Sequence, residues 1–520
     1  MNAVVSCREL ADLMASEELF AVFDVRERGE FNQCQIYRAT SLPRSQMEFR
    51  LAQLVPNRKI PIVLYDDGGA RAPLGAATLM SFGYEQVGVL AGGLGAWQAE
   101  GRPTVSGVNV PSKAFGEKVH HDRKIPELTA EELKALKDAS ADLAILDVRT
   151  PEEYARFCIP GGNNVPGGDL IHWAAELKQR SNTTVVVNCA GRTRSIIGTA
   201  ALLRLGLTNV RALRNGTMGW VLSGLELENH PERKPMPAPQ ASRAHGIALA
   251  RQLAAEENLP WISEREVANA ALVEPLTYLL DVRSEPEYEA GHIPGSISVP
   301  GGQAVQRADD FVAVKNARVV FASGQSARAV MAAYWYRQMG FRNVFVLQDG
   351  LDGWLQERGG IEKGRGSVDL LGFEAAKQAV RGTDPQILDR WIRSRAPLVL
   401  DVGASLDFET NHLPGAQWMS RGWLDLKMPE LFPERGQAIV LTCPDGQHSL
   451  FAAQALNRLG YTEVAVLTGG VRAWAAAGYP TESGIAPCLV EANDVVLSPS
   501  IRGSKDDMQR YLDWEMKLPH

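Results

Sequence analysis

Apolar positions along the chain gather into short runs that end in Asp-Val, and this pattern occurs four times. The four runs are Ala21–Val25, Ala144–Val148, Tyr278–Val282 and Leu398–Val402. Seven positions after each aspartate stands an aromatic residue, at Phe31, Tyr154, Tyr288 and Phe408. A short apolar run bounded by polar positions predicts a buried β-strand. The chain therefore contains four copies of one predicted strand and of the segment that follows it.

Further landmarks keep the same spacing in all four copies. Forty-two residues after each aspartate comes an equivalent position, which is occupied by Asp66, Cys189, Ser323 and Cys443. Thirty-one residues later comes a tryptophan, each one four positions after a glycine, at Trp97, Trp220, Trp354 and Trp474. No copy carries a net insertion between these landmarks. The chain is therefore predicted to consist of four internal repeats.

Within each repeat the pattern predicts strands that alternate with helices. A second apolar run leads to the Cys189 position, a helical pattern follows it, and a third apolar run such as Val210–Leu213 precedes the Gly-x-x-x-Trp segment. Strands that are apolar along their whole length and alternate with helices are typical of parallel sheets covered on both faces. We therefore predict a doubly wound α/β fold in each of four tandem domains.

Gly- and Pro-rich breaks in the pattern suggest the domain boundaries. The predicted domains span residues 1–105, 122–230, 258–360 and 370–485, and a polar tail at 486–520 contains a short amphipathic stretch, Met508–Met516. Residues 101–122 are predicted to form the first linker, and residues 359–367 open the third junction. The Pro-rich segment 230–242 predicts a break between two halves of the chain.

Composition and charge narrow the function classes. A net charge of −7 over 520 residues argues against nucleic acid or an anionic membrane as the main partner, because both require a basic surface. The six cysteines are too few and too scattered for a disulfide framework, and no pair has the spacing of metal ligands. No apolar run approaches the roughly 18 residues of a membrane span. We expect a cytoplasmic protein without a bound metal or cofactor.

The segment Thr184–Ser195 carries the strongest chemical signal. A β-branched run ends in Cys189, a short loop containing Gly191, Arg192 and Arg194 follows, and an apolar helical pattern begins. In such an arrangement the loop amides and the helix N-terminus point at the sulfur, and the arginines add positive charge. The sequence predicts a thiol with a lowered pKa, which is a reactive nucleophile.

The repeat resembles the rhodanese domain, the sulfurtransferase module. The resemblance covers nearly the whole chain, and its motifs are Asp-Val-Arg followed by an acidic–aromatic pair, His-Ile-Pro-Gly, the cysteine loop and Gly-Gly-x-x-x-Trp. The matching residues are Asp147–Arg149 with Glu153–Tyr154, Asp281–Arg283 with Glu287–Tyr288, His292–Gly295, and His412–Gly415, where leucine replaces the isoleucine.

The resemblance implies a ping-pong reaction in which the cysteine takes a sulfane sulfur from a donor such as thiosulfate. The resulting cysteine persulfide passes this sulfur to cyanide or a thiol. Cys189 is then the nucleophile and persulfide carrier, and Gly191 permits the tight loop. The substrate-binding residues are expected to be Gly191, Arg192, Thr193, Arg194 and Ser195, with the two arginines holding the sulfonate of the donor.

The fourth repeat keeps a thiol in a different setting, Cys443-Pro-Asp-Gly-Gln-His-Ser449. Asp445 replaces Gly191, and Gln447 and His448 replace the Thr-Arg pair. The positive charge is therefore expected to be smaller and partly dependent on pH. Cys443 is predicted to be a second sulfur carrier of lower reactivity, or else a leftover thiol.

The first and third repeats lack the nucleophile. Asp66 and Ser323 stand at the cysteine position, and neither side chain can carry a persulfide. These two domains are predicted to be inactive structural or docking partners. The alternative is that the loops ending in Arg71 and Arg328 still bind an anion.

Several other residues are predicted to be structural. The four strand-end aspartates, Asp24, Asp147, Asp281 and Asp401, are expected to bond loop amides or an arginine. The four tryptophans are expected to be core or hinge residues. Cys158 replaces the histidine of the His-Ile-Pro-Gly motif and is expected to be a small buried residue, with a resolving thiol as the alternative.

Two other function classes stay open at this point. A phosphatase or arsenate reductase would use the same Cys-Arg loop, but Cys189 and Arg194 enclose four residues, a shorter loop than those enzymes use for a tetrahedral oxyanion. A sulfur-trafficking scaffold would hand the sulfur of Cys189 to a specific accepting protein. The physiological donor, and whether the two halves pair within one chain or in a homodimer, also stay open.

Overall fold

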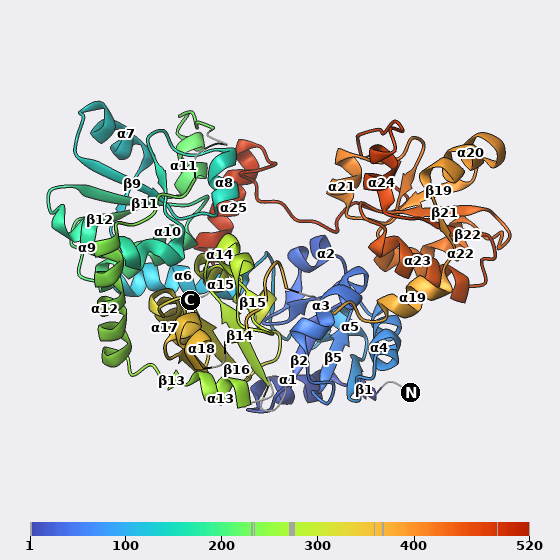
Figure 1. The fold of residues 1–520 in the computed structure, drawn as a ribbon, viewed down its shortest axis with the longest axis horizontal. Helices are drawn as coiled ribbons and strands as arrows, with labels where there is room; N and C mark the ends of the chain where they lie inside the picture. Colours follow the sequence, from blue (N-terminus) through green and yellow to red (C-terminus); the bar gives the residue numbers. More distant parts are fainter. Residues whose placement is uncertain are drawn as a thin grey trace. The chain divides into compact units, whose positions relative to one another are not determined.

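A computed structural model describes residues 3–229, 232, 234–269, 276–357, 359–366, 369–485 and 487–518. The chain divides into two compact units, one formed by residues 1–108 and 368–496 and the other by residues 109–367 and 497–520. The first unit thus contains the first and fourth repeats, and the second unit contains the second and third repeats together with the C-terminal residues. In every repeat helices lie on both sides of a central sheet (Figure 1).

In the first repeat the sheet has five parallel strands in the order β1-β6-β5-β2-β4. These strands are β1 (Ala3–Val5), β2 (Ala21–Asp24), β4 (Thr40–Ser41), β5 (Ile62–Tyr65) and β6 (Val87–Leu90). A separate antiparallel pair joins β3 (Gln35–Ile36) to β7 (Thr104–Val105). The helices are α1 (Cys7–Ala15), α2 (Arg28–Gln33), η1 (Arg44–Gln46), α3 (Met47–Leu54), α4 (Arg71–Ser81) and α5 (Gly93–Ala99).

The second repeat has the same parallel order, β8-β12-β11-β9-β10. Its strands are β8 (Glu127–Leu128), β9 (Leu143–Asp147), β10 (Asn163–Asn164), β11 (Thr184–Asn188) and β12 (Val210–Leu213). The helices are α6 (Val110–Arg123), α7 (Ala130–Asp138), α8 (Pro151–Arg156), η2 (Gly167–Asp169), α9 (Leu170–Gln179), α10 (Thr193–Arg204), α11 (Gly216–Leu222) and α12 (Gln240–Glu256).

The third repeat follows the order β13-β17-β16-β14-β15. Its strands are β13 (Trp261–Ile262), β14 (Thr277–Asp281), β15 (Ile297–Ser298), β16 (Arg318–Ala322) and β17 (Val344–Leu347). The helices are α13 (Glu264–Asn269), α14 (Glu285–Ala290), α15 (Gly301–Gln306), α16 (Ala308–Phe311), α17 (Ala327–Gln338) and α18 (Gly350–Glu357).

The fourth repeat follows the order β18-β22-β21-β19-β20. Its strands are β18 (Gly382–Thr383), β19 (Leu398–Asp401), β20 (Gln417–Trp418), β21 (Ile439–Thr442) and β22 (Val464–Leu467). The helices are α19 (Phe373–Ala379), α20 (Pro385–Arg395), α21 (Ser405–Thr410), η3 (Arg421–Trp423), α22 (Leu424–Leu431), α23 (Gln447–Arg458) and α24 (Gly470–Ala476), and the last helix of the chain is α25 (Lys505–Met516).

The predicted fold class is confirmed, because each repeat has a parallel sheet buried between helices. Every residue of β5, β14 and β21 is buried, as expected for strands covered on both faces. The three predicted strands form the centre of each sheet. The two edge strands of each sheet have only two or three residues, as β8 and β10 do, and so have too few apolar positions to be seen in the sequence pattern.

The conserved landmarks of the repeats are structural, as predicted. Both carboxylate oxygens of Asp147 accept hydrogen bonds from Arg149, whose Nη2 also donates to Phe157 O. Asp24 and Asp281 hold Arg26 and Arg283 in the same way. The four tryptophans are buried, and each indole Nε1 donates to a carbonyl six residues further on, that of Pro103, Glu226, Gly360 or Pro480.

The segments between repeats differ from the prediction. The predicted first linker contains β7 and the 14-residue helix α6, which packs on α10 of the second repeat. The Pro-rich segment does not separate two halves, because α12 directly after it packs on both α9 and α17 and so ties the second repeat to the third. Four residues of the predicted breaks, His230, Pro231, Arg233 and Ser367, lie outside the described residues.

Candidate active site

Cys189 lies directly after the central strand β11, in a short loop that ends where α10 begins at Thr193. The backbone of this loop is held by the start of α11. Thr217 N donates to Cys189 O at 2.8 Å, and Met218 N donates to Ala190 O at 3.0 Å. The carboxyl ends of the central strands therefore place the thiol at the edge of the sheet where sites of open α/β folds form.

Gly216 explains why each tryptophan is preceded by a glycine. Its φ is +54°, and a Cβ there would lie 2.1 Å from Cys189 O, so that no other residue fits. A Cβ on the equivalent glycine of each other repeat would likewise collide with the carbonyl oxygen of Asp66, Ser323 or Cys443. The glycine thus permits the contact between α11 and the cysteine loop.

The Cys189 sulfur is buried, with 2% of the residue exposed, and Sγ lies 3.7 Å from Ser195 Oγ. Burial raises the pKa of the thiol above its ordinary value. The charge of Arg194 and the hydroxyl and amide of Ser195 act to lower this pKa, and the carboxylate of Glu515 acts to raise it. The predicted lowering of the pKa is therefore not found in this structure, because desolvation outweighs the nearby positive charge.

The two arginines of the loop differ in their surroundings. Arg194 forms a bidentate pair with Glu153 at 2.6 and 2.7 Å, and its charge lowers the pKa of Glu153 to about 2 against the opposing effect of burial. Arg192 points to α6, where it pairs with Glu117 at 2.7 and 2.9 Å. Both guanidinium groups are thus neutralised, and Arg194 is the one whose charge acts on the thiol.

The pairing of Glu153 with Arg194 was not predicted from the sequence, although the repeats contain a signal for it. Glu30 pairs with Arg71 and Glu287 pairs with Arg328, and in each repeat the two residues are 41 positions apart. The fourth repeat has Asp407 and His448 at these positions. The pair therefore changes together between repeats, as residues in contact do.

Glu515 is a second residue that the sequence analysis missed. It belongs to α25, which packs against α6 and α11 of the same unit. Glu515 Oε1 accepts hydrogen bonds from Thr193 N at 3.3 Å and from Thr193 Oγ1 at 2.5 Å. The predicted polar tail thus contributes a carboxylate to the Cys189 loop.

The fourth repeat places Cys443 at the same position but among different charges. Its Sγ lies 3.6 Å from Ser449 Oγ and 3.8 Å from Asp445 Oδ1. Burial raises the pKa of this thiol, the hydroxyl and amide of Ser449 lower it, and the carboxylates of Asp401 and Asp445 raise it further. The leading charges that act on this pKa are thus negative, whereas at Cys189 the leading charge is that of Arg194.

His448 does not supply the pH-dependent positive charge that was predicted for this loop. Its ring stacks on Phe49 of the first repeat, with the ring centroids 4.1 Å apart. Burial lowers the pKa of His448 to about 3, so the imidazole is neutral at pH 7. The strand-end Asp401 also differs, because Gly403 replaces the usual arginine and burial raises the pKa of Asp401 to about 7.

The first and third repeats carry no thiol at this position. Asp66 fills its own loop, because Oδ1 accepts from Gly68 N and Gly69 N and Oδ2 accepts from Ala72 N, at 2.8 to 3.0 Å. The hydroxyl of Ser323 is buried, and no described group hydrogen-bonds to it.

Cys158 lies in the backbone clamp that closes the second repeat. Its N donates to Glu228 O at 2.7 Å and its O accepts from Glu228 N at 2.9 Å, and His292 and His412 form the same bridge in their repeats. Burial, with a contribution from Glu228, raises the pKa of Cys158 to about 11. These contacts favour the structural interpretation of Cys158.

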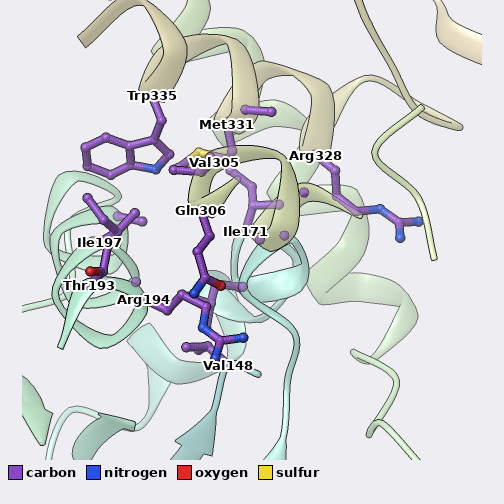
Figure 2. A pocket seen from close by; sticks show the side chains of 18 residues that line it. Val148, Ile171, Thr193, Arg194, Ile197, Val305, Gln306, Arg328, Met331 and Trp335 are labelled. Atoms are coloured by element: carbon purple, nitrogen blue, oxygen red, sulfur yellow. The ribbon is translucent and has the colours of Figure 1, made fainter. Parts of the chain in front are cut away.

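A pocket of about 600 Å³, counted with the solvent at its mouth, lies between the second and third repeats in the second unit. Figure 2 shows Arg194 and Arg328, which stand at equivalent positions of their repeats, with Ile197 and Trp335 among the lining side chains. Cys189 is not one of its lining residues. The pocket therefore adjoins the reactive loop without opening onto the thiol.

Neither a metal centre nor a membrane span is found in the described part of the chain. Its histidine, cysteine, aspartate and glutamate side chains form no group of three that could hold a metal ion. Among its helices, none combines the length and the apolar character needed to cross a membrane.

Comparison with known proteins identifies relatives over the whole chain. The model of the rhodanese-like domain family matches residues 6–100, 129–223, 264–357 and 384–477. The crystal structure of a thiosulfate sulfurtransferase from Pseudomonas aeruginosa is similar with a TM-score of 0.92 and 40% sequence identity, and the match covers 99% of this chain and 97% of that one.

Curated relatives match shorter stretches. A thiosulfate sulfurtransferase of Azotobacter vinelandii is 31% identical over 153 residues, which are 29% of this chain and 55% of the relative. A sulfurtransferase of Allochromatium vinosum is 31% identical over 102 residues, which are 20% of this chain and 94% of the relative. The chain thus spans about half the length of the Azotobacter protein. From the four matched domains and the match to a solved structure along nearly its whole length, the chain belongs to the rhodanese-like domain family.

Proposed function

We propose that this protein is a thiosulfate sulfurtransferase that carries sulfane sulfur as a persulfide on Cys189. The observation that supports this most directly is the comparison of the four equivalent loops, all of which are described. Two loops have a thiol, and that of Cys189 is the one in which a guanidinium charge, that of Arg194, acts on the sulfur. Relatives that are named sulfurtransferases make the same chemistry the expected one.

The first half-reaction loads the enzyme. The Cys189 thiolate attacks the outer sulfur of thiosulfate, a new S–S bond forms to Sγ, and the old S–S bond breaks as sulfite leaves with its electron pair. Arg194 offsets the negative charge on the thiol and on the persulfide.

The second half-reaction unloads the enzyme. Cyanide or an acceptor thiolate attacks the terminal sulfur of the persulfide, and Cys189 leaves as a thiolate. The products are thiocyanate or a new persulfide, and no external oxidant or reductant is consumed. A small thiophile is the acceptor that we propose, with a sulfur-accepting protein as the alternative. The repeats pair within one chain, the first with the fourth and the second with the third.

Cys443 is proposed as a slower, secondary carrier. Its loop has the same serine contact as Cys189, but two carboxylates replace the guanidinium charge. A cytoplasmic location also belongs to the proposal, because all six cysteines, each within the described residues, are free thiols, and such thiols persist in a reducing compartment.

Intact-mass measurement after incubation with thiosulfate, and separately with 3-mercaptopyruvate, tests the proposal. The wild type and Cys443→Ser should gain the mass of one sulfur atom and lose it on addition of cyanide. Cys189→Ser should gain much less, with any remaining adduct on Cys443. If the adduct survives undiminished in Cys189→Ser, or never forms in the wild type, the assignment is wrong.

The phosphatase alternative has its own test on the same proteins. Hydrolysis of an aryl phosphate by the wild type that disappears in Cys189→Ser would replace sulfur transfer with oxyanion hydrolysis. We expect no hydrolysis above the Cys189→Ser background, because four residues between Cys189 and Arg194 make a small ring.

A further inference from the structure

The C-terminal helix α25 covers the loop of Cys189. It begins at a capping box in which Ser504 and Asp507 bond each other's backbone amides. Leu512 is buried, and the rings of Tyr511 and Trp514 lie 4.8 Å from Nζ of Lys113 on α6, so that cation–π contacts add to the apolar packing. Figure 1 shows α25 next to α11, which holds the backbone of the loop.

The side chain that α25 brings to the loop is the carboxylate of Glu515, of which 1% is exposed. Its Oε1 accepts the two hydrogen bonds from Thr193. Its Oε2 is buried, and no described group hydrogen-bonds to it. A Cβ on Gly191 would lie 3.3 Å from this oxygen, which places Oε2 directly over the cysteine loop.

Thr193 is the first residue of α10, so its amide is one of the donors that a helix leaves unsatisfied at its N-terminus. Such amides attract anions, and here the resident anion is Glu515. In the first repeat a carboxylate also accepts hydrogen bonds from the equivalent loop, but it belongs to the loop itself. The carboxylate of Asp66 accepts from the amides of Gly68, Gly69 and Ala72. A carboxylate is therefore a natural occupant of this loop.

Within the described part of the chain, a donor that enters the Cys189 site meets loop cations and Thr193 donors that already have partners. Arg192 is paired with Glu117, Arg194 is paired with Glu153, and the donors of Thr193 are taken by Glu515. The anionic end of the donor must therefore displace the Glu515 carboxylate or lie against it. In either arrangement the electrostatic repulsion from Glu515 is stronger for a doubly charged donor than for a singly charged one.

We infer that Glu515 is a specificity-determining residue that occupies the position of the donor's anionic group and competes with it. The inference rests on the proposed function, and it adds a residue that discriminates between donors by their charge. Glu515 weakens the capture of dianionic donors such as thiosulfate more than that of monoanionic donors such as alkanethiosulfonates. The C-terminal helix is thus part of the donor site.

The test compares the two donor classes on the full-length protein. Persulfide formation is followed by rapid mixing, acid quenching and intact-mass measurement, and the donor concentration at half-maximal rate is determined. Glu515→Gln keeps the size of the side chain and removes its charge. We expect the half-saturating concentration to fall roughly fivefold to tenfold for thiosulfate and about twofold for an alkanethiosulfonate, since one like charge at the anion position is removed.

Two further variants complete the test. Asp513→Asn removes a charge from the same helix at a residue that bonds Gln509, and should change neither concentration. Glu515→Ala should lower the half-saturating concentration of thiosulfate more than that of the alkanethiosulfonate, as Glu515→Gln does. This variant is needed because the buried amide of the glutamine could itself disturb the packing. Melting curves show whether each variant is folded.

The outcomes separate the inference from the proposed function. If the wild type forms no adduct with either donor, the proposed function fails and the inference fails with it. If adducts form but the ratio of the two half-saturating concentrations is the same in the wild type, Glu515→Gln and Glu515→Ala, the inference alone is overturned. An equal effect of Asp513→Asn would also overturn it, because the change would then reflect the charge of the helix in general.

Discussion

The loops of Cys189 and Cys443 share a backbone and differ in their charges. Each cysteine follows the central strand of its sheet, each sulfur lies 3.6 to 3.7 Å from the hydroxyl of a serine six residues later, and each loop is held by an amide of the following Gly-x-x-x-Trp helix. The charge of Arg194 lowers the thiol pKa in one loop, and Asp401 and Asp445 raise it in the other. The fold places the sulfur, and the neighbouring side chains decide what the sulfur can do.

This difference extends beyond the loops. Three repeats keep both an aspartate–arginine pair at the strand end and a glutamate–arginine pair beside the loop. The fourth repeat has lost the arginine of each pair, leaving Gly403 and the neutral His448. Because a thiolate needs nearby positive charge to form in a buried site, the two losses together account for the lower reactivity expected of Cys443.

The largest effect should come from removing the charge that distinguishes Cys189. Arg194→Ala should slow persulfide formation about a hundredfold, because the thiol loses its cation and Glu153 is left unpaired. Arg192→Ala, whose guanidinium faces Glu117 on α6, should have a much smaller effect. The double variant Arg194→Met with Glu153→Gln leaves no unpaired charge, and recovery of the full rate in it would show that the arginine acts only on stability.

The strand-end aspartates should differ in the pH dependence of stability. Because the pKa of Asp401 is about 7 in the folded protein, the folded state holds a proton that the unfolded state has released, and stability falls as the pH rises from about 4 to 7. Asp401→Asn should remove this loss. The pKa of Asp401 is raised by about three, which limits the loss in the free energy of unfolding to about 4 kcal/mol. Relaxation of the site lowers the loss that we expect between pH 4 and pH 7 to about 2 kcal/mol.

Denaturant unfolding of the wild type and Asp401→Asn at pH 5 and pH 7 measures this difference. Burial also raises the pKa of Glu27, in the same unit, to about 7. The stability of the variant should therefore still fall with rising pH, but less steeply than that of the wild type. Identical slopes in the two proteins would show that Asp401 is ionised in the folded state.

Restoring the missing pair should activate the fourth site. Asp407→Glu with His448→Arg recreates the pair formed by Glu153 and Arg194, and should speed alkylation of Cys443 by iodoacetamide at pH 7 about tenfold, since one pKa unit changes the thiolate fraction by that factor. His448→Arg alone is the control. It should speed alkylation less, because the new arginine then faces the shorter side chain of Asp407. No gain in the double variant would mean that burial, and not charge, limits Cys443.

The smallest effect is expected at the third thiol considered. Cys158→Ser should leave persulfide formation and turnover with cyanide within about twofold of the wild type, since its thiol, with a pKa near 11, is largely protonated at pH 7. Steady-state assays with thiosulfate and cyanide measure this. A large loss of turnover with an unchanged melting temperature would instead support the resolving-thiol alternative.

Comparison of the repeats made the fold and the reactive cysteine predictable from the sequence. Fixed spacing between apolar runs and landmarks indicates the same parallel α/β domain four times, because strand and helix periods depend on local patterns. The same comparison singles out Cys189, and it could also have revealed the pair of Glu153 and Arg194 from their joint change to Asp407 and His448.

The tertiary structure alone decided which distant segments meet. The first repeat pairs with the fourth and the second with the third, α6 carries Glu117 to Arg192, and α25 carries Glu515 to Thr193 across more than three hundred residues. No local pattern records such contacts, since a polar tail with an amphipathic stretch is compatible with many docking surfaces. For the same reason the pKa of Cys189 could not be read from its loop, because burial under neighbouring elements outweighs the charge of its own arginine.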